Sequence, residues 1–295
     1  MSNFTLASLS PAPWPVVELL DIGAMPEGTP RFQRLVDQGL VSVTSFEPQD
    51  EERARLGPPS RGNRVLPYVL GDGKPGILHV TRYPGCTSLF EPDPAVIDMF
   101  DSMGAAGPGG NFAVMRREPV QTRRLDDIDE CPKADFVKID VQGAELLVLE
   151  NAVAKIADAV VIDCEVEFVA LYKNQALFGD IHSFMRRQGF AFHKFLDISG
   201  RTFLPMTRRN RRAATSQGLW ADAIFVKDFS RLERFGDGQL LKAALILHEA
   251  YASVDLVLRL LLEYDRRTGE RRGQRYTAAL QTGESLQTMY MNCKS

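Results

Sequence analysis

Apolar and polar positions alternate along the chain with two different periods. Short apolar runs that stop at glycine, proline or an acid are typical of buried strands, whereas apolar residues spaced by three and four are typical of helices. Strands are expected at residues 16–24, 41–46, 65–70, 77–82, 136–140, 159–165, 190–196 and 221–226. Helices are expected at residues 31–40, 50–56, 144–154 and 178–188, with two more within 240–263.

The order of these elements predicts the fold class. Strands that alternate with helices indicate parallel neighbours, and residues 159–165 are apolar nearly throughout, as in a strand buried on both faces. The strand at 77–82 is expected to be antiparallel or to lie at an edge. Together the elements predict an α/β protein with a Rossmann-like, doubly wound sheet and a small C-terminal helical addition.

Composition suggests where the domains begin and end. Residues 1–15 hold three prolines among small residues, as in an irregular leader. We expect the main domain at 16–228, with a loop-rich, lid-like insertion at 83–119, because long insertions in α/β cores are usually functional or mobile. A helical extension with a polar tail from Asp265 is expected at 229–295.

Charge and cysteine usage argue against several classes of function. The net charge of -3 provides no field for holding nucleic acid or a membrane. No apolar run approaches the roughly 20 residues of a membrane span, and the N-terminus lacks the basic start and apolar core of a secretory signal. The four cysteines have no CxxC spacing, which excludes a zinc site by pattern and suits a reducing cytosol. We therefore expect a cytoplasmic protein.

Acidic residues follow three successive strands. Asp21 and Gly23 end the first, Glu47 ends the second and Asp72 follows the third. A glycine there lets the backbone approach a ligand closely, and a carboxylate after the second strand accepts both hydroxyls of a ribose. The set predicts a nucleoside-containing cofactor at the sheet edge, although each residue alone could be a helix cap or a turn former.

The turn after the first strand discriminates between such cofactors. It reads Gly23-Ala24-Met25-Pro26-Glu27-Gly28, so it lacks the G-x-G-x-x-G of dinucleotide folds and has a glutamate where a pyrophosphate would lie. The sulfonium and amine of S-adenosylmethionine prefer acidic surroundings. The turn therefore favours methyl transfer over the hydride transfer of an NAD-dependent oxidoreductase.

The stretch Asp135–Leu146 carries the densest candidate chemistry. Lys138 and Asp140 point to the same face of an apolar strand, and Asp140 stands where that strand ends. A charged pair is expensive to bury unless it has a partner or a chemical role. The stretch therefore predicts a functional site.

These residues, taken in order, resemble the FkbM family of S-adenosylmethionine-dependent methyltransferases. The similar motifs are Asp21-Ile-Gly-Ala24, Phe46-Glu-Pro48, Thr87-Ser-Leu89, Thr122–Ile128, Lys138–Glu145, Glu165–Phe168, Leu171-Tyr172, Leu177-Phe178, Gly189-Phe190 and Trp220–Val226. The resemblance covers roughly Val16 to Asp228. It implies a class I methyltransferase sheet with an added antiparallel strand, and methylation of hydroxyl oxygens on sugars, polyketides or related metabolites.

By position, the resemblance also implies roles for the site residues. Asp21, Gly23 and Ala24 would contact the methionine part of the cofactor, Glu47 its ribose and Asp72 its adenine. Ser88 is grouped with them because it lies in the motif Thr87-Ser-Leu89. Lys138, Asp140 and Glu145 occupy the family's signature stretch. The family usually continues its first motif as Ala-Asn-x-Gly, which Met25–Gly28 does not match. A non-catalytic relative used for binding or assembly is therefore the alternative.

Methyl transfer needs an aligned acceptor oxygen and a group that removes its proton, because the sulfonium donor is already activated. Asp140 is the first candidate for that group, and Glu165 and Glu167 follow. Lys138 would assist Asp140 or simply neutralise it. We assign no metal, although Asp140, Asp163 and Glu165 could alternatively hold a divalent cation.

The remaining features indicate partners. The acceptor is expected to be a small molecule or a carbohydrate. The apolar stripe at 241–258 would pack on the sheet domain or across a homodimer of the C-terminal helices. The basic run Arg208–Arg212 lacks interleaved aromatics and is expected to be a solvated hairpin loop, with contact to an anionic acceptor as the alternative.

Overall fold

The computed structural model describes residues 4–10, 12–25, 28–56, 62–104, 109–210 and 214–282. The chain forms two compact units. One, here called the helical unit, comprises Met1–Glu18, Glu27–Ser42 and Asp228–Ser295. The other, the sheet unit, comprises Leu19–Pro26 and Val43–Lys227. The domain limits expected from composition stay a prediction.

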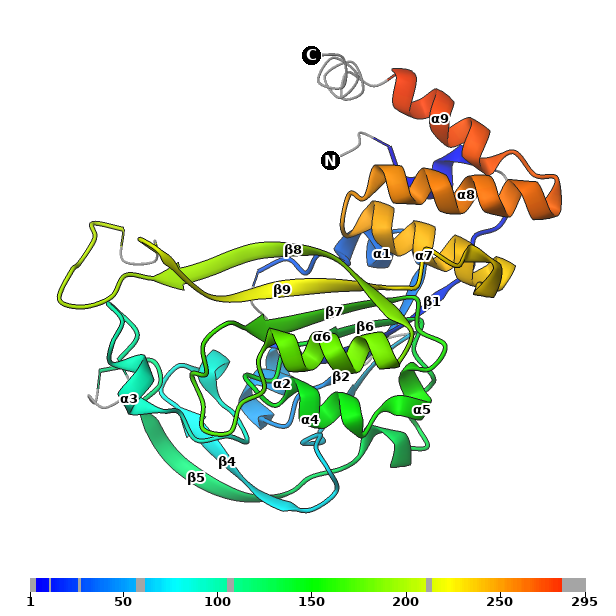
Figure 1. Ribbon diagram of the computed structural model, residues 1–295. Coiled ribbons are helices and arrows are strands. Elements are labelled where there is room, and N and C mark those ends of the chain that lie inside the picture. The colour runs from blue at the N-terminus through cyan, green and yellow to red at the C-terminus, as the bar shows by residue number, and fades with distance from the viewer. Residues whose placement is uncertain are drawn as a thin grey trace. The chain divides into compact units, whose positions relative to one another are not determined.

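Seven strands form one sheet in the order β3-β2-β1-β6-β7-β9-β8 (Figure 1). They are β1 (Val17–Ile22), β2 (Val41–Phe46), β3 (Asn63–Leu66), β6 (Phe136–Ile139), β7 (Val161–Glu167), β8 (Phe190–Arg201) and β9 (Gln217–Lys227). The pairs β2–β3, β1–β6 and β6–β7 are parallel, whereas β9 runs antiparallel to both β7 and β8. This confirms the expected class, a mostly parallel sheet with an antiparallel strand.

Helices complete the two units. In the sheet unit they are α2 (Asp50–Arg55), α3 (Pro94–Ile97), α4 (Glu145–Glu150), α5 (Val153–Ile156) and α6 (Phe178–Arg187); in the helical unit they are α1 (Gln33–Asp37), α7 (Asp237–Glu249), α8 (Val254–Thr268) and α9 (Arg272–Thr282). Figure 1 shows α4, α5 and α6 together on one face of the sheet. Their buried residues, such as Leu149, Ile156 and Ile181, share one core with strand residues such as Ile139 and Ile162.

The insertion was expected to be loop-rich with a short helical stretch near residues 95–103, and α3 lies at the start of that stretch, but the insertion also contains a strand. Strands β4 (Pro75–Thr81) and β5 (Val114–Gln121) form a separate antiparallel two-stranded sheet. β5 therefore begins inside the insertion expected at residues 83–119, where no strand was expected. β5 has no buried residue: Val114, Glu118 and Val120 are half-buried and the other five are exposed, so the sequence has no apolar run here. The strand expected at 77–82 is antiparallel, as predicted, but it belongs to this second sheet.

The end of the helical unit also differs from the expectation. A polar tail was expected from Asp265, but α8 continues to Thr268 and α9 follows it. Only two apolar side chains of α9, Tyr276 and Leu280, are buried, so its apolar pattern is weak. Within the described part of the chain, no helix combines the length and the apolarity that crossing a membrane requires.

Candidate active site

The ends of three strands meet at one edge of the sheet. The backbone N–H groups of Gly23 and Ala24 donate to the carbonyl oxygen of Phe46 at 3.1 and 3.2 Å. The N–H of Asp140 donates to the carbonyl oxygen of Ile22 at 3.0 Å. The carboxyl ends of β1, β2 and β6 therefore lie side by side, which is the usual place for ligands in such sheets.

Gly23 is required by this meeting of strands. Its φ of +77° lies in the left-handed region, and a Cβ at this position would be 1.8 Å from the carbonyl oxygen of Asp140. We expected the glycine to let the backbone approach a ligand, but the close approach seen here is to the end of β6. Any larger residue would push β1 and β6 apart.

Lys138 and Asp140 form an ion pair on β6 and just past its end. Lys138 Nζ lies 3.5 Å from Asp140 Oδ2, and both side chains are about one-third exposed, at 28% and 32%. Burial alone would lower the pKa of Lys138, but the carboxylates of Asp140, Asp21 and Asp163 raise it well above its ordinary value. Burial would raise the pKa of Asp140, but the Lys138 charge and hydrogen bonds outweigh it and lower that pKa. Asp140 is therefore ionised.

Gln142 links Asp140 to Glu165. Its Nε2 donates to Asp140 Oδ1 at 2.8 Å and to Glu165 Oε2 at 2.6 Å. The residue has a φ of +57°, which is uncommon for a side chain other than glycine, asparagine or aspartate. The Tyr172 hydroxyl lies 3.1 Å from Gln142 Oε1 and 3.0 Å from the Cys86 carbonyl oxygen. These contacts fix the direction in which the amide points.

Glu165 and Glu167, on the next strand, are held in the neutral form. Burial, followed by the charge of Asp140, raises the pKa of Glu165 well above its ordinary range, and protonated Glu165 shares a hydrogen bond with Asp140. Burial and the nearby Glu145 raise the pKa of Glu167 in the same way. Glu167 Oε2 is buried and has no hydrogen-bond partner among the described residues.

Glu145 opens α4 directly beneath this group. Its Oε1 accepts hydrogen bonds from the backbone N–H groups of Val141 at 2.8 Å and Gly143 at 3.2 Å, so it shapes the turn after β6. Its Oε2 is buried without a partner among the described residues. Burial, with Asp140 adding to it, raises the pKa of Glu145 to about 7.

Three of these acids are close enough to share a cation. Single oxygens of Asp140, Glu145 and Glu165 lie within 4.8 Å of one another, and no other such group occurs among the described residues. Asp163, which we had considered as a ligand, lies on β7 in register with Lys138 and is not one of the three. The Gln142 amide already bridges Asp140 and Glu165, whereas Glu145 Oε2 has no hydrogen-bond partner among the described residues.

The residues expected on the cofactor side lie in different surroundings. Asp21 is buried, and burial raises its pKa, which Lys138 counteracts. Glu47 is buried as well, its Oε1 accepts from the Gln49 N–H at 2.8 Å, and burial raises its pKa. The charge of Asp21 acts on Glu47 and that of Asp140 acts on Asp21, so these three carboxyl groups are neighbours.

Asp72 and Ser88 make other contacts. Asp72 accepts hydrogen bonds from the Lys74 backbone N–H at 3.1 Å and from Lys74 Nζ at 2.8 Å, as a turn former does. Ser88 is buried, and its hydroxyl donates to the Gln142 carbonyl oxygen at 2.7 Å. Ser88 therefore holds the turn after β6, while the hydrogen bonds of Asp72 go to its own loop.

The comparison with protein families identifies the family of the chain that carries this site. The Methyltransferase FkbM domain matches residues 21–192, which is more than half of the chain. The chain belongs to the FkbM methyltransferase family. The protein is therefore a methyltransferase that uses S-adenosylmethionine as its methyl donor.

Two solved structures have similar arrangements. One is a putative methyltransferase from Thermoplasma acidophilum, with 11% identity, 77% of this chain and 76% of that chain covered, and a TM-score of 0.33. The other is magnesium protoporphyrin IX methyltransferase from Synechocystis PCC 6803 with bound SAM, with 14% identity, 72% and 71% covered, and a TM-score of 0.31. No curated protein matches the chain.

The residues at the edge of this methyltransferase fit the charge of its cofactor. S-adenosylmethionine carries a sulfonium and an ammonium group, and the edge offers the carboxyl groups of Asp21, Glu47 and Asp140, with Lys138 beside Asp140 and Arg53 near Glu47. The altered turn at Met25–Gly28 is only partly described, because Pro26 and Glu27 lie outside the described residues.

Sequence reasoning on the methyltransferase missed Gln142, Tyr172 and the part that Glu145 plays. Gln142 and Glu145 stood in the motif Lys138–Glu145, but nothing in their spacing indicates that the amide joins two strands. The sequence signal was Gly143, because a glycine after a strand end indicates a tight turn. The structure shows that turn, with a φ of +96° at Gly143.

Proposed function

We propose that this methyltransferase methylates a hydroxyl oxygen of a sugar or another small metabolite, with Asp140 as the group that receives the hydroxyl proton. One observation carries the proposal: an ionised carboxylate, Asp140, beside Lys138 at the strand edge. The donor supplies an activated methyl group on a sulfonium. A C–O bond forms as the C–S bond breaks, and the hydroxyl proton passes to Asp140.

The neighbours of Asp140 support this role. Lys138 keeps the carboxylate ionised before the acceptor binds, and Gln142 holds one of its oxygens at 2.8 Å so that the other can face an acceptor. Neutral Glu165 donates to Asp140 and adds no negative charge that would oppose deprotonation of a hydroxyl. A base held in place in this way loses little conformational freedom during the reaction.

On the cofactor side we assign Glu47 to the ribose hydroxyls, and Asp21, Gly23 and Ala24 to the methionine part. The buried position of Glu47 after β2 and its closeness to Asp21 support the assignment. Ser88 acts indirectly, by holding the turn at Gln142. The adenine contact of Asp72 is the weakest part of the proposal, because its hydrogen bonds go to Lys74.

Isothermal titration of the full-length protein with S-adenosylhomocysteine tests the cofactor site, and transfer of a labelled methyl group to paired acceptors tests the chemistry. Each pair consists of a sugar and its amino analogue. We expect the product to bind and the label to appear on the sugar hydroxyl. Absence of binding at millimolar S-adenosylhomocysteine would support the non-catalytic alternative, and label on nitrogen alone would contradict oxygen transfer.

The cation alternative has a test of its own. Activity that persists after EDTA treatment supports Asp140 as the base. Loss of activity that added Mg²⁺ restores would instead assign Asp140, Glu145 and Glu165 as ligands.

We also propose the cytoplasm as the place of action. The buried cysteines Cys131 and Cys164 are free thiols, which suits a reducing compartment. Treatment of the native protein with a thiol reagent, before and after unfolding, should show that they react only when the protein is unfolded.

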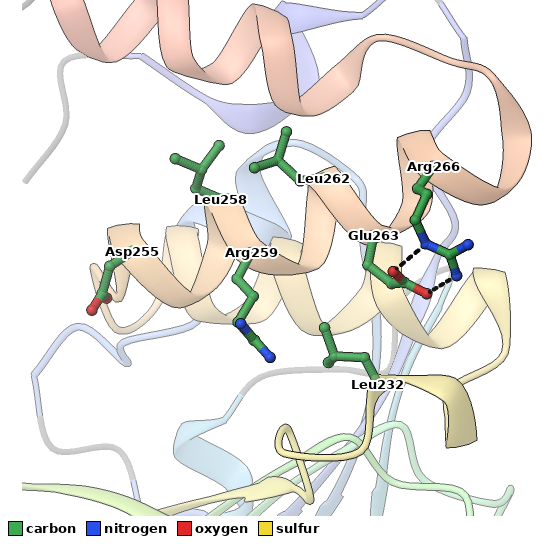
Figure 2. A pocket seen from close by; sticks show the side chains of 7 residues that line it. All are labelled: Leu232, Asp255, Leu258, Arg259, Leu262, Glu263 and Arg266. Atoms are coloured by element: carbon green, nitrogen blue, oxygen red, sulfur yellow. Dashed lines mark hydrogen bonds and ion pairs between the residues drawn. The ribbon is translucent and has the colours of Figure 1, made fainter.

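We also propose that two copies of the chain associate through α8 of the helical unit. Leu262 is 47% exposed, and Figure 2 shows it next to Leu258 on an open groove. The other residues that line it are Leu232, Asp255, Arg259, Glu263 and Arg266. Glu263 is already engaged by Arg266 through two hydrogen bonds of 2.8 Å, so the leucines would carry the contact. Sedimentation equilibrium should give a dimer that Leu258→Ser with Leu262→Ser converts to a monomer.

A further inference from the structure

The loop that joins β8 to β9 has a composition unlike the rest of the chain. From Ile198, near the end of β8, through the loop to Ala221 in β9, the sequence contains five arginines and neither an acid nor a lysine, although the whole chain has a net charge of -3. An averaged charge therefore hides a local cationic segment. Arg208 and Arg209 are exposed, while Arg211 and Arg212 lie outside the described residues.

Large apolar side chains are exposed in the same loop. Phe203, Leu204 and Met206 are 41%, 47% and 59% exposed, and Met99, which lies against them, is 43% exposed. The Leu204 N–H donates to the Met99 carbonyl oxygen at 2.8 Å, which places these two side chains in one patch. We call these four residues, with Arg208 and Arg209, the hairpin tip. They include four of the eleven large apolar side chains that are exposed among the described residues.

The hairpin tip is anchored to the insertion. The rings of Phe203 and Phe100 lie 4.6 Å apart, and Phe100 itself is buried. The Asp101 N–H donates to the Thr202 carbonyl oxygen at 2.8 Å. The backbone of the hairpin tip is therefore braced against the insertion, and Leu204 and Met206 are the most exposed of its apolar side chains.

The hairpin tip also projects from the edge that holds the active site. Glu167, the last residue of β7, pairs with Trp220, and β9 begins three residues before it at Gln217. The β8–β9 pair thus extends past the carboxyl ends of β6 and β7, as Figure 1 shows.

We propose that the hairpin tip docks on the surface of an anionic lipid bilayer. Phenylalanine, leucine and methionine would enter the boundary between headgroups and acyl chains, while the flanking guanidinium groups pair with lipid phosphates. The choice of a membrane over an acidic protein rests on shape and composition. The tip protrudes past the strand ends and carries aliphatic side chains flanked by guanidinium groups, the combination that enters the surface of an anionic bilayer. Docking would turn the active-site edge toward the membrane surface.

Co-sedimentation of the full-length protein with vesicles tests the proposal. We expect binding to vesicles that contain phosphatidylglycerol, little binding to phosphatidylcholine alone, and weakening by salt. Phe203→Ser with Leu204→Ser should reduce the partition coefficient by at least about tenfold. Arg208→Gln with Arg209→Gln should reduce it by about thirtyfold and flatten the salt dependence.

Matched variants elsewhere in the sheet unit serve as controls. Ile77→Ser with Met115→Ser removes side chains that are 48% and 64% exposed on β4 and β5, and Arg186→Gln with Arg187→Gln removes two exposed charges of α6. Both should bind vesicles like the wild type. Titration with S-adenosylhomocysteine, which does not depend on lipid, shows that every variant is folded.

Three results would overturn the proposal. One is equal binding to neutral and anionic vesicles, another is tip variants that bind as the wild type does, and the third is no binding at all. A tip variant that changes only the oligomeric mass, without an effect on vesicles, would assign the hairpin tip to contacts between copies of the chain and would likewise overturn the lipid proposal.

Discussion

Both units of the molecule bury carboxyl groups, but they do so in opposite ways. In the helical unit, Glu249 is 2% exposed, its Oε1 accepts the Leu6 N–H at 2.7 Å, and its Oε2 lies 3.0 Å from Arg34 Nε. At the active-site edge of the sheet unit, acids outnumber the one nearby lysine. Buried oxygens of Glu145 and Glu167, like Glu249 Oε2, have no hydrogen-bond partner among the described residues, but for Glu249 the charge of Arg34 compensates.

The difference separates a structural carboxylate from a functional group of carboxyls. Burying a charge costs several kcal/mol unless a partner compensates for it, and Arg34 supplies such a partner for Glu249. The crowded edge is instead relieved by protonation, because the pKa values of Glu145, Glu165 and Glu167 are raised. Groups held in this unfavourable state are typical of sites that act on a ligand.

The strongest test of the comparison is Asp140→Asn. The amide keeps the shape of the side chain but cannot accept the hydroxyl proton, so we expect turnover to fall by about 10²- to 10⁴-fold, the usual contribution of a general base. Stability should fall moderately, because Lys138 loses the carboxylate that pairs with it while Asp21 and Asp163 still act on it. Methyl transfer to whichever sugar the wild type accepts, together with urea unfolding, measures both.

Asp158→Asn is the matched control for that variant, since Asp158 is exposed and pairs with Lys133 at 3.1 Å. It should leave turnover unchanged. Turnover by Asp140→Asn at the wild-type rate would remove Asp140 from the site.

Arg34→Ala should show the opposite behaviour. It leaves the buried Glu249 without its cation, so we expect the free energy of unfolding of the helical unit to fall by about 3 kcal/mol, the lower end for a broken buried pair because Arg34 is partly exposed. The affinity of the folded protein for S-adenosylhomocysteine should stay the same. Chemical unfolding followed by circular dichroism measures the loss, with Arg259→Ala on the exposed face of α8 as the control. An undiminished stability would mean that Glu249 does not need Arg34.

The two units also differ in how well the sequence predicts them. The strands of the main sheet are apolar runs closed by turn residues, and their positions are predicted within a few residues. β5 and α9 are missed because few of their side chains are buried and because they pack on segments distant in the sequence, β4 and residues Leu6–Leu9. β3 ends at Leu66 instead of residue 70, which moves Asp72 from a strand end into a turn.

For the site, the sequence predicts which residues reach the edge but not how they are connected. The placement of Asp21, Glu47 and Asp140 follows from strand ends that meet in any parallel sheet. The bridge through Gln142 depends on one left-handed residue and on a tyrosine thirty residues away, and neither is readable as a pattern. For the hairpin tip, the sequence shows the basic run Arg208–Arg212, but it does not show that Met99, Phe203, Leu204 and Met206 are exposed beside it.

The pH dependence of stability sharpens the comparison further. The folded protein holds the Glu145 proton more tightly than the unfolded chain, with a pKa of about 7 against 4.5. Its contribution to stability is therefore fully present below pH 4.5 and is lost as the pH rises through 7. The free energy of unfolding of the wild type, relative to that of Glu145→Gln, should fall by about 3 kcal/mol over that range. Urea unfolding at several pH values, in buffer with EDTA, measures this fall. A wild type that instead gains stability relative to the variant as the pH rises would show that Glu145 is ionised in the folded state.

Glu47→Ala gives the smallest expected effect and tests the cofactor side of the edge. Loss of hydrogen bonds from a carboxylate to the ribose should weaken S-adenosylhomocysteine binding by about 1 to 3 kcal/mol, which titration calorimetry measures directly. Glu51→Ala, an exposed acid of α2, should leave affinity unchanged. If Glu47 is instead a structural acid like Glu249, the variant loses stability and keeps its affinity, because the carboxylate then serves only the Gln49 N–H. A larger loss of S-adenosylhomocysteine affinity than of stability therefore identifies Glu47 as a ligand-binding carboxylate, and the reverse identifies it as a structural one.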